Sequence, residues 1–294
     1  MISKNQIGLI YMIFSVISFS LMDISVKLMS SNYPIGQLVF YRGFLGLIPI
    51  FFIVPFSRYK NLLVTTKLKL HIGRAVVGTF AMINLYLGLK FLPIADAITI
   101  SFAAPIFATI FSIIFLKEFV RFYRWFAIVI GVVGLIIVLK PGTGMFSYYS
   151  FFPILFCIGF ATISILIKKL SKTEPDYLIS MYFTIILILT GASSYFFGWN
   201  TINSKDIIYL FAIGIFGSTG NILLTMSIRK ADISLVTPVK YLSLIFAIMA
   251  GIFIFDEAIS YSTLFGAILI ILSTAIIFKR EAIKKVKTTI VRQI

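Results

Sequence analysis

The sequence predicts an all-α integral membrane protein, with ten transmembrane helices arranged as two inverted five-helix repeats. Of its 294 residues, 60% are hydrophobic and only 12% are charged, whereas soluble domains carry about 25% charged residues. The apolar residues form ten runs of about 20 residues, the length that spans a hydrocarbon layer of about 30 Å. The chain also resembles itself when it is shifted by about 139 residues. A soluble enzyme of this size is excluded.

The apolar runs are bounded by charges, prolines and turn residues, which mark the predicted helix ends. Each run is longer than the roughly 9–11 residues of a membrane β-strand, and its hydrophobicity does not alternate. The first run is too long for the core of a signal peptide and has no cleavage site near its end, so we expect it to remain as a span. The predicted helices are 7–28, 36–56, 72–90, 95–116, 123–140, 149–168, 178–198, 206–227, 233–255 and 261–279.

The basic residues predict the orientation. With the N-terminus in the cytoplasm, twenty Lys and Arg fall on the cytoplasmic side, Arg74 among them, and four fall on the other side. Cytoplasmic loops of membrane proteins are enriched in these residues. We therefore expect a multi-pass protein of the cell inner membrane with both termini in the cytoplasm and a basic tail at 280–294. This topology also explains the net charge of +16 without nucleic acid as a partner.

The internal repeat divides the chain into two units, 7–140 and 149–279. The shift of 139 residues places Gly78 on Gly217 and Glu118 on Glu257. Because each unit holds five predicted helices, an odd number, the second unit must enter the membrane in the opposite orientation. Inverted repeats can exchange their packing around a site near the bilayer midplane, which is the architecture of alternating access.

Short motifs in both units resemble a known family. Phe115-Leu116-Lys117-Glu118, followed by Gly131, and Phe255-Asp256-Glu257, followed by Gly266, are similar to the EamA-type repeats of the drug/metabolite transporter superfamily. The resemblance covers residues 8–279. It implies a ten-helix carrier whose central cavity is lined mainly by helices 1, 3, 4, 6, 8 and 9.

Two further stretches resemble one branch of this superfamily. Tyr41-Arg42 and the segment 237–242 are similar to the branch that contains the S-adenosylmethionine uptake carriers of intracellular alphaproteobacteria. That branch usually has arginine where this chain has Lys240. The resemblance implies uptake or exchange of S-adenosylmethionine or a similar metabolite.

Two charged residues, Asp23 and Arg42, lie within predicted spans at about the same depth. A charge inside a span is costly unless it is paired or hydrated, so each is a candidate functional residue. One interpretation is a buried ion pair between helices 1 and 2. The other is that Arg42 meets a substrate carboxylate while Asp23 meets a proton or a substrate cation.

Lys240 and Tyr241 follow Pro238 in the ninth predicted helix. The Lys240 ammonium either attracts an anionic group of the substrate or extends to the lipid headgroups. The Tyr241 ring either stacks on a flat substrate or packs against its neighbours. Pro105 and Pro238 lie in corresponding helices of the two repeats, and interrupted helices in paired positions are typical of carrier binding sites.

Uncharged polar side chains inside the spans complete the candidate substrate-binding set. Each either hydrogen-bonds a polar metabolite or joins neighbouring helices. Asn221 and Thr225 share one helix face at a spacing of four residues. The uncharged candidates are Asn84, Tyr86, Ser101 and Asn221.

The leading hypothesis is a secondary-active transporter that moves a small polar metabolite. No nucleotide-binding loop occurs, so the driving force is a gradient, an exchange or protons. An exporter of amino acids, metabolites or drugs fits the same residues, and a non-transporting scaffold or sensor is a more distant alternative. One cysteine and one histidine leave no metal site, no cofactor is expected, and the absence of hydrolase motifs argues against an enzyme. We expect a monomer or homodimer in the lipid bilayer.

Overall fold

The protein folds as a bundle of apolar helices. The computed structural model describes residues 4–55, 57, 62–104, 106–107, 110–111, 122–139, 147–231, 237–273 and 275–276, and no strand occurs among them. Six of its helices are long and apolar enough to cross a membrane, which makes this a multi-pass membrane protein. The helices are α1 (Lys4–Ser30), α2 (Ile35–Ile53), α3 (Leu68–Phe91), α4 (Ile94–Ser101), α6 (Phe122–Leu139), α7 (Phe151–Leu170), α8 (Asp176–Ser193), α9 (Ile207–Lys230), α11 (Leu242–Phe253) and a last helix, Tyr261–Ser273.

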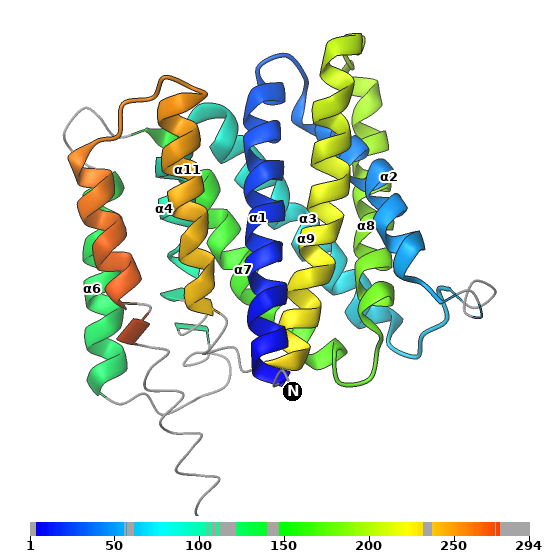
Figure 1. Ribbon diagram of the computed structural model, residues 1–294, viewed down its shortest axis with the longest axis horizontal. Helices are drawn as coiled ribbons and strands as arrows, with labels where there is room; N and C mark the ends of the chain where they lie inside the picture. Colours follow the sequence, from blue (N-terminus) through cyan, green and yellow to red (C-terminus); the bar gives the residue numbers. More distant parts are fainter. Residues whose placement is uncertain are drawn as a thin grey trace, which may run out of the picture.

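Helices from the two halves of the chain alternate in the bundle. α1 packs against α9, α2 against α8 and α9, and α3 against α7 and α8. Figure 1 shows α1 and α9 side by side in the centre, with α2 and α8 on one side and α4, α6 and α11 on the other. Large apolar side chains such as Phe52 and Phe196 are exposed on the outside, where lipid would cover them.

Small residues let α1 and α9 approach closely. The Ser15 hydroxyl donates to the Gly220 carbonyl at 2.8 Å, and the Ser227 hydroxyl donates to the Gly8 carbonyl at 2.8 Å. A Cβ atom on Gly220 would lie 3.1 Å from the Phe19 ring. Without a hydrophobic driving force between helices in lipid, such packing and hydrogen bonding hold helices together.

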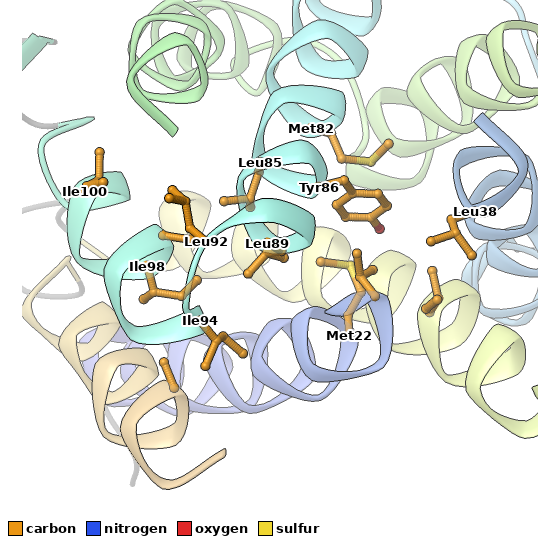
Figure 2. Packing of buried hydrophobic residues seen from close by; sticks show 14 of the residues in the cluster. Met22, Leu38, Met82, Leu85, Tyr86, Leu89, Leu92, Ile94, Ile98 and Ile100 are labelled. Atoms are coloured by element: carbon orange, nitrogen blue, oxygen red, sulfur yellow. The ribbon is translucent and has the colours of Figure 1, made fainter. Parts of the chain in front are cut away.

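The largest buried apolar cluster connects α1, α3 and α4. Figure 2 shows Met22 of α1, Tyr86 and Leu89 of α3, and Ile94 and Ile98 of α4 turned toward one another. α4 begins only three residues after α3 ends, so its buried face covers the end of the cluster.

Two predicted spans are interrupted. The expected helix 95–116 is wrong as a continuous helix, because α4 ends at Ser101 and residues 102–103 form a turn before helical residues resume at 104. A proline at position 105 has no N–H for the Ser101 carbonyl, which instead accepts from the Cys157 thiol at 3.4 Å. Pro105 itself lies outside the described residues. The expected span 233–255 likewise contains a 3₁₀ turn, η5 (Thr237–Tyr241), before α11.

Other helix ends also differ from the prediction. α3 begins at Leu68, four residues before the predicted start, which draws further polar residues into the helix. α8 ends at Ser193 and continues as a 3₁₀ helix, Ser194–Phe197. Gly198, whose φ is 88°, then reverses the chain in a conformation that favours glycine.

We expect Gly191→Ala to lower the free energy of unfolding by about 1–3 kcal/mol, as overpacking does. The added methyl would overlap the backbone nitrogen and Cα of Phe40, and backbone atoms, unlike a side chain, cannot rotate away from the contact. Gly73→Ala is the matched control, because nothing lies within 4 Å of its added Cβ. Thermal unfolding of both purified variants in detergent measures the difference, and equal stability of the two would contradict this account of the α2–α8 contact.

Candidate functional site

Two arginines and one aromatic ring meet where α2, α3 and α8 come together. Arg42 of α2 is 5% exposed and Arg74 of α3 is 2% exposed. Their guanidinium carbons lie 5.5 Å and 4.3 Å from the centre of the Phe183 ring of α8. Cations are attracted to the face of an aromatic ring, so Phe183 stabilises both guanidinium groups.

A short hydrogen-bond chain orients one of these arginines. Arg74 Nη2 donates to Asn221 Oδ1 of α9 at 3.0 Å, and Asn221 Nδ2 donates to the Ser180 hydroxyl at 3.1 Å. Arg74 Nε and Nη1 and Arg42 Nη1 are buried and have no hydrogen-bond partner among the residues that the structure describes. No ion pair within the described part of the chain includes either arginine.

Asp23 lies close enough to Arg42 for an electrostatic interaction, but no ion pair joins the two side chains. Its carboxylate instead borders a cavity of about 10 Å³, which Ser20, Ile94, Ile98 and Ser243 also line. Asp23 Oδ1 and the Ser20 hydroxyl have no hydrogen-bond partner within the described part of the chain. A cavity of this size is at the lower limit for one water molecule, so the carboxylate can be hydrated or exchange a proton there.

Tyr86 lies close to the arginine pair. Its ring centre is 5.9 Å from the Arg42 guanidinium carbon, and no described residue forms a hydrogen bond with its buried hydroxyl. Figure 2 shows this hydroxyl turned toward the space between Met22 and Leu38. The structure therefore brings the predicted site residues Arg42 and Tyr86 together.

Lys240 and Tyr241 form a separate polar region within η5. Lys240 Nζ lies 4.1 Å above the Phe160 ring of α7. The Tyr241 ring meets Phe102 edge-on at 5.4 Å, and its hydroxyl donates to the Ile271 carbonyl at 3.5 Å. The Lys240 ammonium thus lies against one aromatic ring, that of Phe160.

The other predicted polar residues bond mainly within their own helices. Asn84 donates to the Phe80 carbonyl at 2.9 Å, and Ser101 donates to the Ile98 carbonyl at 2.6 Å. Thr225 donates to the backbone carbonyl of Asn221 at 2.9 Å. Pro238 belongs to η5, but its side chain lies outside the described residues.

Sequence reasoning missed Arg74 and Phe183 as site residues. Arg74 was counted with the cytoplasmic charges because the third helix was predicted to start only two residues before it. The internal repeat was the signal that could have found them, because it aligns Gly78 with Gly217 and both glycines lie beside the two arginines and Phe183. A Cβ on Gly217 would be 2.7 Å from Arg42 Nε, and one on Gly78 would be 3.0 Å from the Phe183 ring.

An ion pair ties the helices together at the end of the bundle near Ile94. Lys27 Nζ of α1 lies 2.8 Å from Glu257 Oε1, and Glu257 Oε2 accepts from the backbone N–H of Ile94 at 2.8 Å. Lys27 also donates to the carbonyls of Leu89 and Leu92, at 3.2 and 2.6 Å. The Thr263 hydroxyl donates to Asp96 of α4. These contacts connect α1, α3, α4 and the last helix at that end of the bundle.

The described residues contain no group of three or more His, Cys, Asp or Glu side chains that would hold a metal ion. The charged groups inside the bundle, two guanidinium groups, one ammonium and one carboxylate, are instead suited to bind an organic ion with separate positive and negative groups.

Comparison with known proteins gives a matching family profile and several named relatives. The profile of the EamA-like transporter family matches residues 6–140 and again 147–279. The chain is 32% identical over 283 residues to the S-adenosylmethionine uptake transporter of Rickettsia bellii, covering 94% of each chain, and 30% identical to that of Rickettsia prowazekii, covering 93% of each.

More distant similarities extend the comparison. The chain is 24% identical to the pseudopaline exporter CntI of Pseudomonas aeruginosa, covering 90% of this chain and 94% of the exporter. A solved crystal structure of a protein with 13% identity superposes with a TM-score of 0.62, covering 92% of this chain and 95% of the other. That superposition supports the fold.

We expect Glu257→Gln to lower the free energy of unfolding by about 1–3 kcal/mol, the range for a lost hydrogen bond to a charged group. The amide oxygen can still accept from Ile94, but Lys27 loses its counter-ion. Lys27→Met is destabilising by itself because Lys27 also donates to the Leu89 and Leu92 carbonyls. The double variant should nevertheless lose less than the sum of the two single losses, with a coupling energy of at least about 0.5 kcal/mol. Thermal unfolding of the single and double variants measures this coupling, and strictly additive losses would show that the pair contributes nothing.

Proposed function

Since the chain belongs to the EamA-like transporter family, we propose that it takes up S-adenosylmethionine, by exchange or with a coupled proton. The observation that carries this proposal is the similarity at 30–32% identity, along nearly the whole chain, to proteins named S-adenosylmethionine uptake transporter. The substrate has a carboxylate, a cationic sulfonium and a flat adenine ring. The helix bundle offers a group of matching chemistry for each.

We assign these groups to the residues inside the bundle. Arg42 is proposed to meet the carboxylate, with Tyr86 beside it, and Asp23 is proposed to meet the sulfonium or the coupled proton. Lys240 and Tyr241, with the rings of Phe160 and Phe102, provide surfaces for adenine. Asn84, Ser101 and Asn221 complete the proposed site by holding the helix geometry.

We propose that transport occurs by alternating access between two inverted five-helix repeats, 7–140 and 149–279. The two matches of the family profile, to residues 6–140 and 147–279, support a duplicated unit. The packing of α1 on α9 and of α3 on α7 supports exchange between the halves. The interruptions at the end of α4 and at η5 are suited to a binding site near the midplane, where unwound backbone is available to a ligand.

Export is the second candidate function. It is favoured by the similarity to the pseudopaline exporter, which is lower in identity but equally extensive along that chain. Exchange reconciles the two, because the gradient of the partner substrate then decides the direction of net transport.

Purified protein in liposomes is expected to accumulate labelled S-adenosylmethionine saturably, and faster with S-adenosylhomocysteine inside. Arg42→Ala should abolish this uptake because the substrate loses its carboxylate partner. Lys205→Ala removes the same charge from a loop and serves as the control that keeps activity. Uptake by Arg42→Ala at the rate of the control would remove Arg42 from the site, and no uptake by the folded wild type would remove the substrate.

We also propose that both termini lie in the cytoplasm of an inner-membrane protein. An alkaline phosphatase fused after Ser31 should be active, since this enzyme works only outside the cytoplasm, whereas a fusion after Lys172 should be inactive. Activities measured in intact cells test this, and an active fusion after Lys172 would reverse the orientation.

A further inference from the structure

We propose that Arg42 and Arg74 together form a single carboxylate-binding site, with the Phe183 ring as the wall that they share. This inference rests on the proposed function and names the part of the substrate that the site recognises. It adds Arg74, which the sequence placed among the cytoplasmic charges, as a residue that determines specificity.

The burial of two unpaired cations is the first step of the argument. Arg42 and Arg74 are at least 95% buried, inside helices that are apolar enough to span a membrane. Charged side chains at such depth are costly and normally have a partner. Neither arginine has an ion-pair partner in the described ranges, although Asp23 interacts electrostatically with Arg42. One carboxylate against two guanidinium groups leaves one positive charge uncompensated, and a ligand can supply the second negative charge.

The hydrogen-bond pattern shows which donors remain for that ligand. Asn221 engages Nη2 of Arg74 and is itself fixed by Ser180. Nε and Nη1 of Arg74 and Nη1 of Arg42 remain buried, with no acceptor in the described ranges of the chain. A guanidinium group binds a carboxylate through two parallel N–H donors, so the unoccupied donors match the oxygens of one carboxylate placed between the two arginines.

Phe183 and two glycines explain how the arginines are tolerated without a ligand. The face of the ring attracts both guanidinium groups, at 4.3 and 5.5 Å. Gly217 leaves the space that Arg42 occupies, since a Cβ there would lie 2.7 Å from Nε. Gly78 does the same for Phe183. Because both arginines are buried, the carboxylate reaches them when the carrier opens, as alternating access requires.

Asn221 provides a variant that tests the site without removing an arginine. In Asn221→Asp, a resident carboxylate of almost the same size would lie next to Arg74, at the position of the oxygen that is now 3.0 Å from Nη2. It should satisfy Arg74 internally and compete with the ligand. The ion pair should also preserve the fold if Arg74→Gln does not fold.

The experiment compares two ligands that differ by one group, S-adenosylmethionine and its decarboxylated form. Binding of each to purified wild type, Arg74→Gln and Asn221→Asp is measured by titration calorimetry. We expect the wild type to prefer the carboxylate by about ten- to a hundredfold, the range for a hydrogen-bonded charge, and both variants to lose this preference. Arg229→Gln, which removes an arginine paired with Asp176 at the end of α9, should retain it.

The outcomes separate this inference from the proposed substrate. Equal weakening of both ligands in the variants, or an unchanged preference, would overturn the carboxylate site while leaving S-adenosylmethionine as substrate. If the folded wild type binds neither compound, the proposed substrate fails. Thermal unfolding with methionine against methionine amide, which lacks the carboxylate, then decides. Stabilisation by the carboxylate form that is lost in Asn221→Asp supports the site, and no such stabilisation overturns it.

Discussion

The ion pair between Lys27 and Glu257 is the constraint on which one end of the bundle depends. It brings the first half of the chain to the second, and through Ile94 it fixes the N-terminus of α4. Lys27 also satisfies carbonyls at the end of α3, where a helix leaves its last acceptors without donors. With α4 held there, Ile94 and Ile98 cover Asp23. The surroundings of Asp23, inside the bundle, thus depend on the ion pair between Lys27 and Glu257 at the end of the helices.

The charges are distributed in two ways. Those at the helix ends are paired: Arg229 lies 2.7 Å from Asp176 and donates to the Glu174 carbonyl, in the same way that Lys27 meets Glu257. Those in the interior, Asp23, Lys240 and the two arginines, have no ion pair in the part of the chain that the structure describes. Pairing at the ends stabilises helix contacts, whereas unpaired interior groups remain available to a passing ligand. This division fits a carrier better than a scaffold, which has no need of unpaired charges.

The helical bundle could be predicted from the sequence because long apolar runs have few alternatives in a membrane. The break in the helix after Ser101 and the position of Arg74 inside the bundle could not be predicted. Pro105 indicated a disturbance, but the hydrogen bonds from the Cys157 thiol, on a distant helix, to the Ile100 and Ser101 carbonyls are visible only in the structure. Asp23 and Arg42 share a depth, yet depth does not give the direction in which a side chain points around a helix. Their neighbours, Ser243 and Phe183, come from the other half of the chain.

Cys157 has a practical consequence for following the motion of this protein. It is the only cysteine of the chain, its side chain is fully buried, and its thiol bonds to the Ile100 and Ser101 carbonyls at the end of α4. A thiol reagent can therefore reach it only when α4 separates from α7. The rate at which the reagent modifies Cys157 therefore reports how often α4 and α7 separate, and no other cysteine has to be introduced.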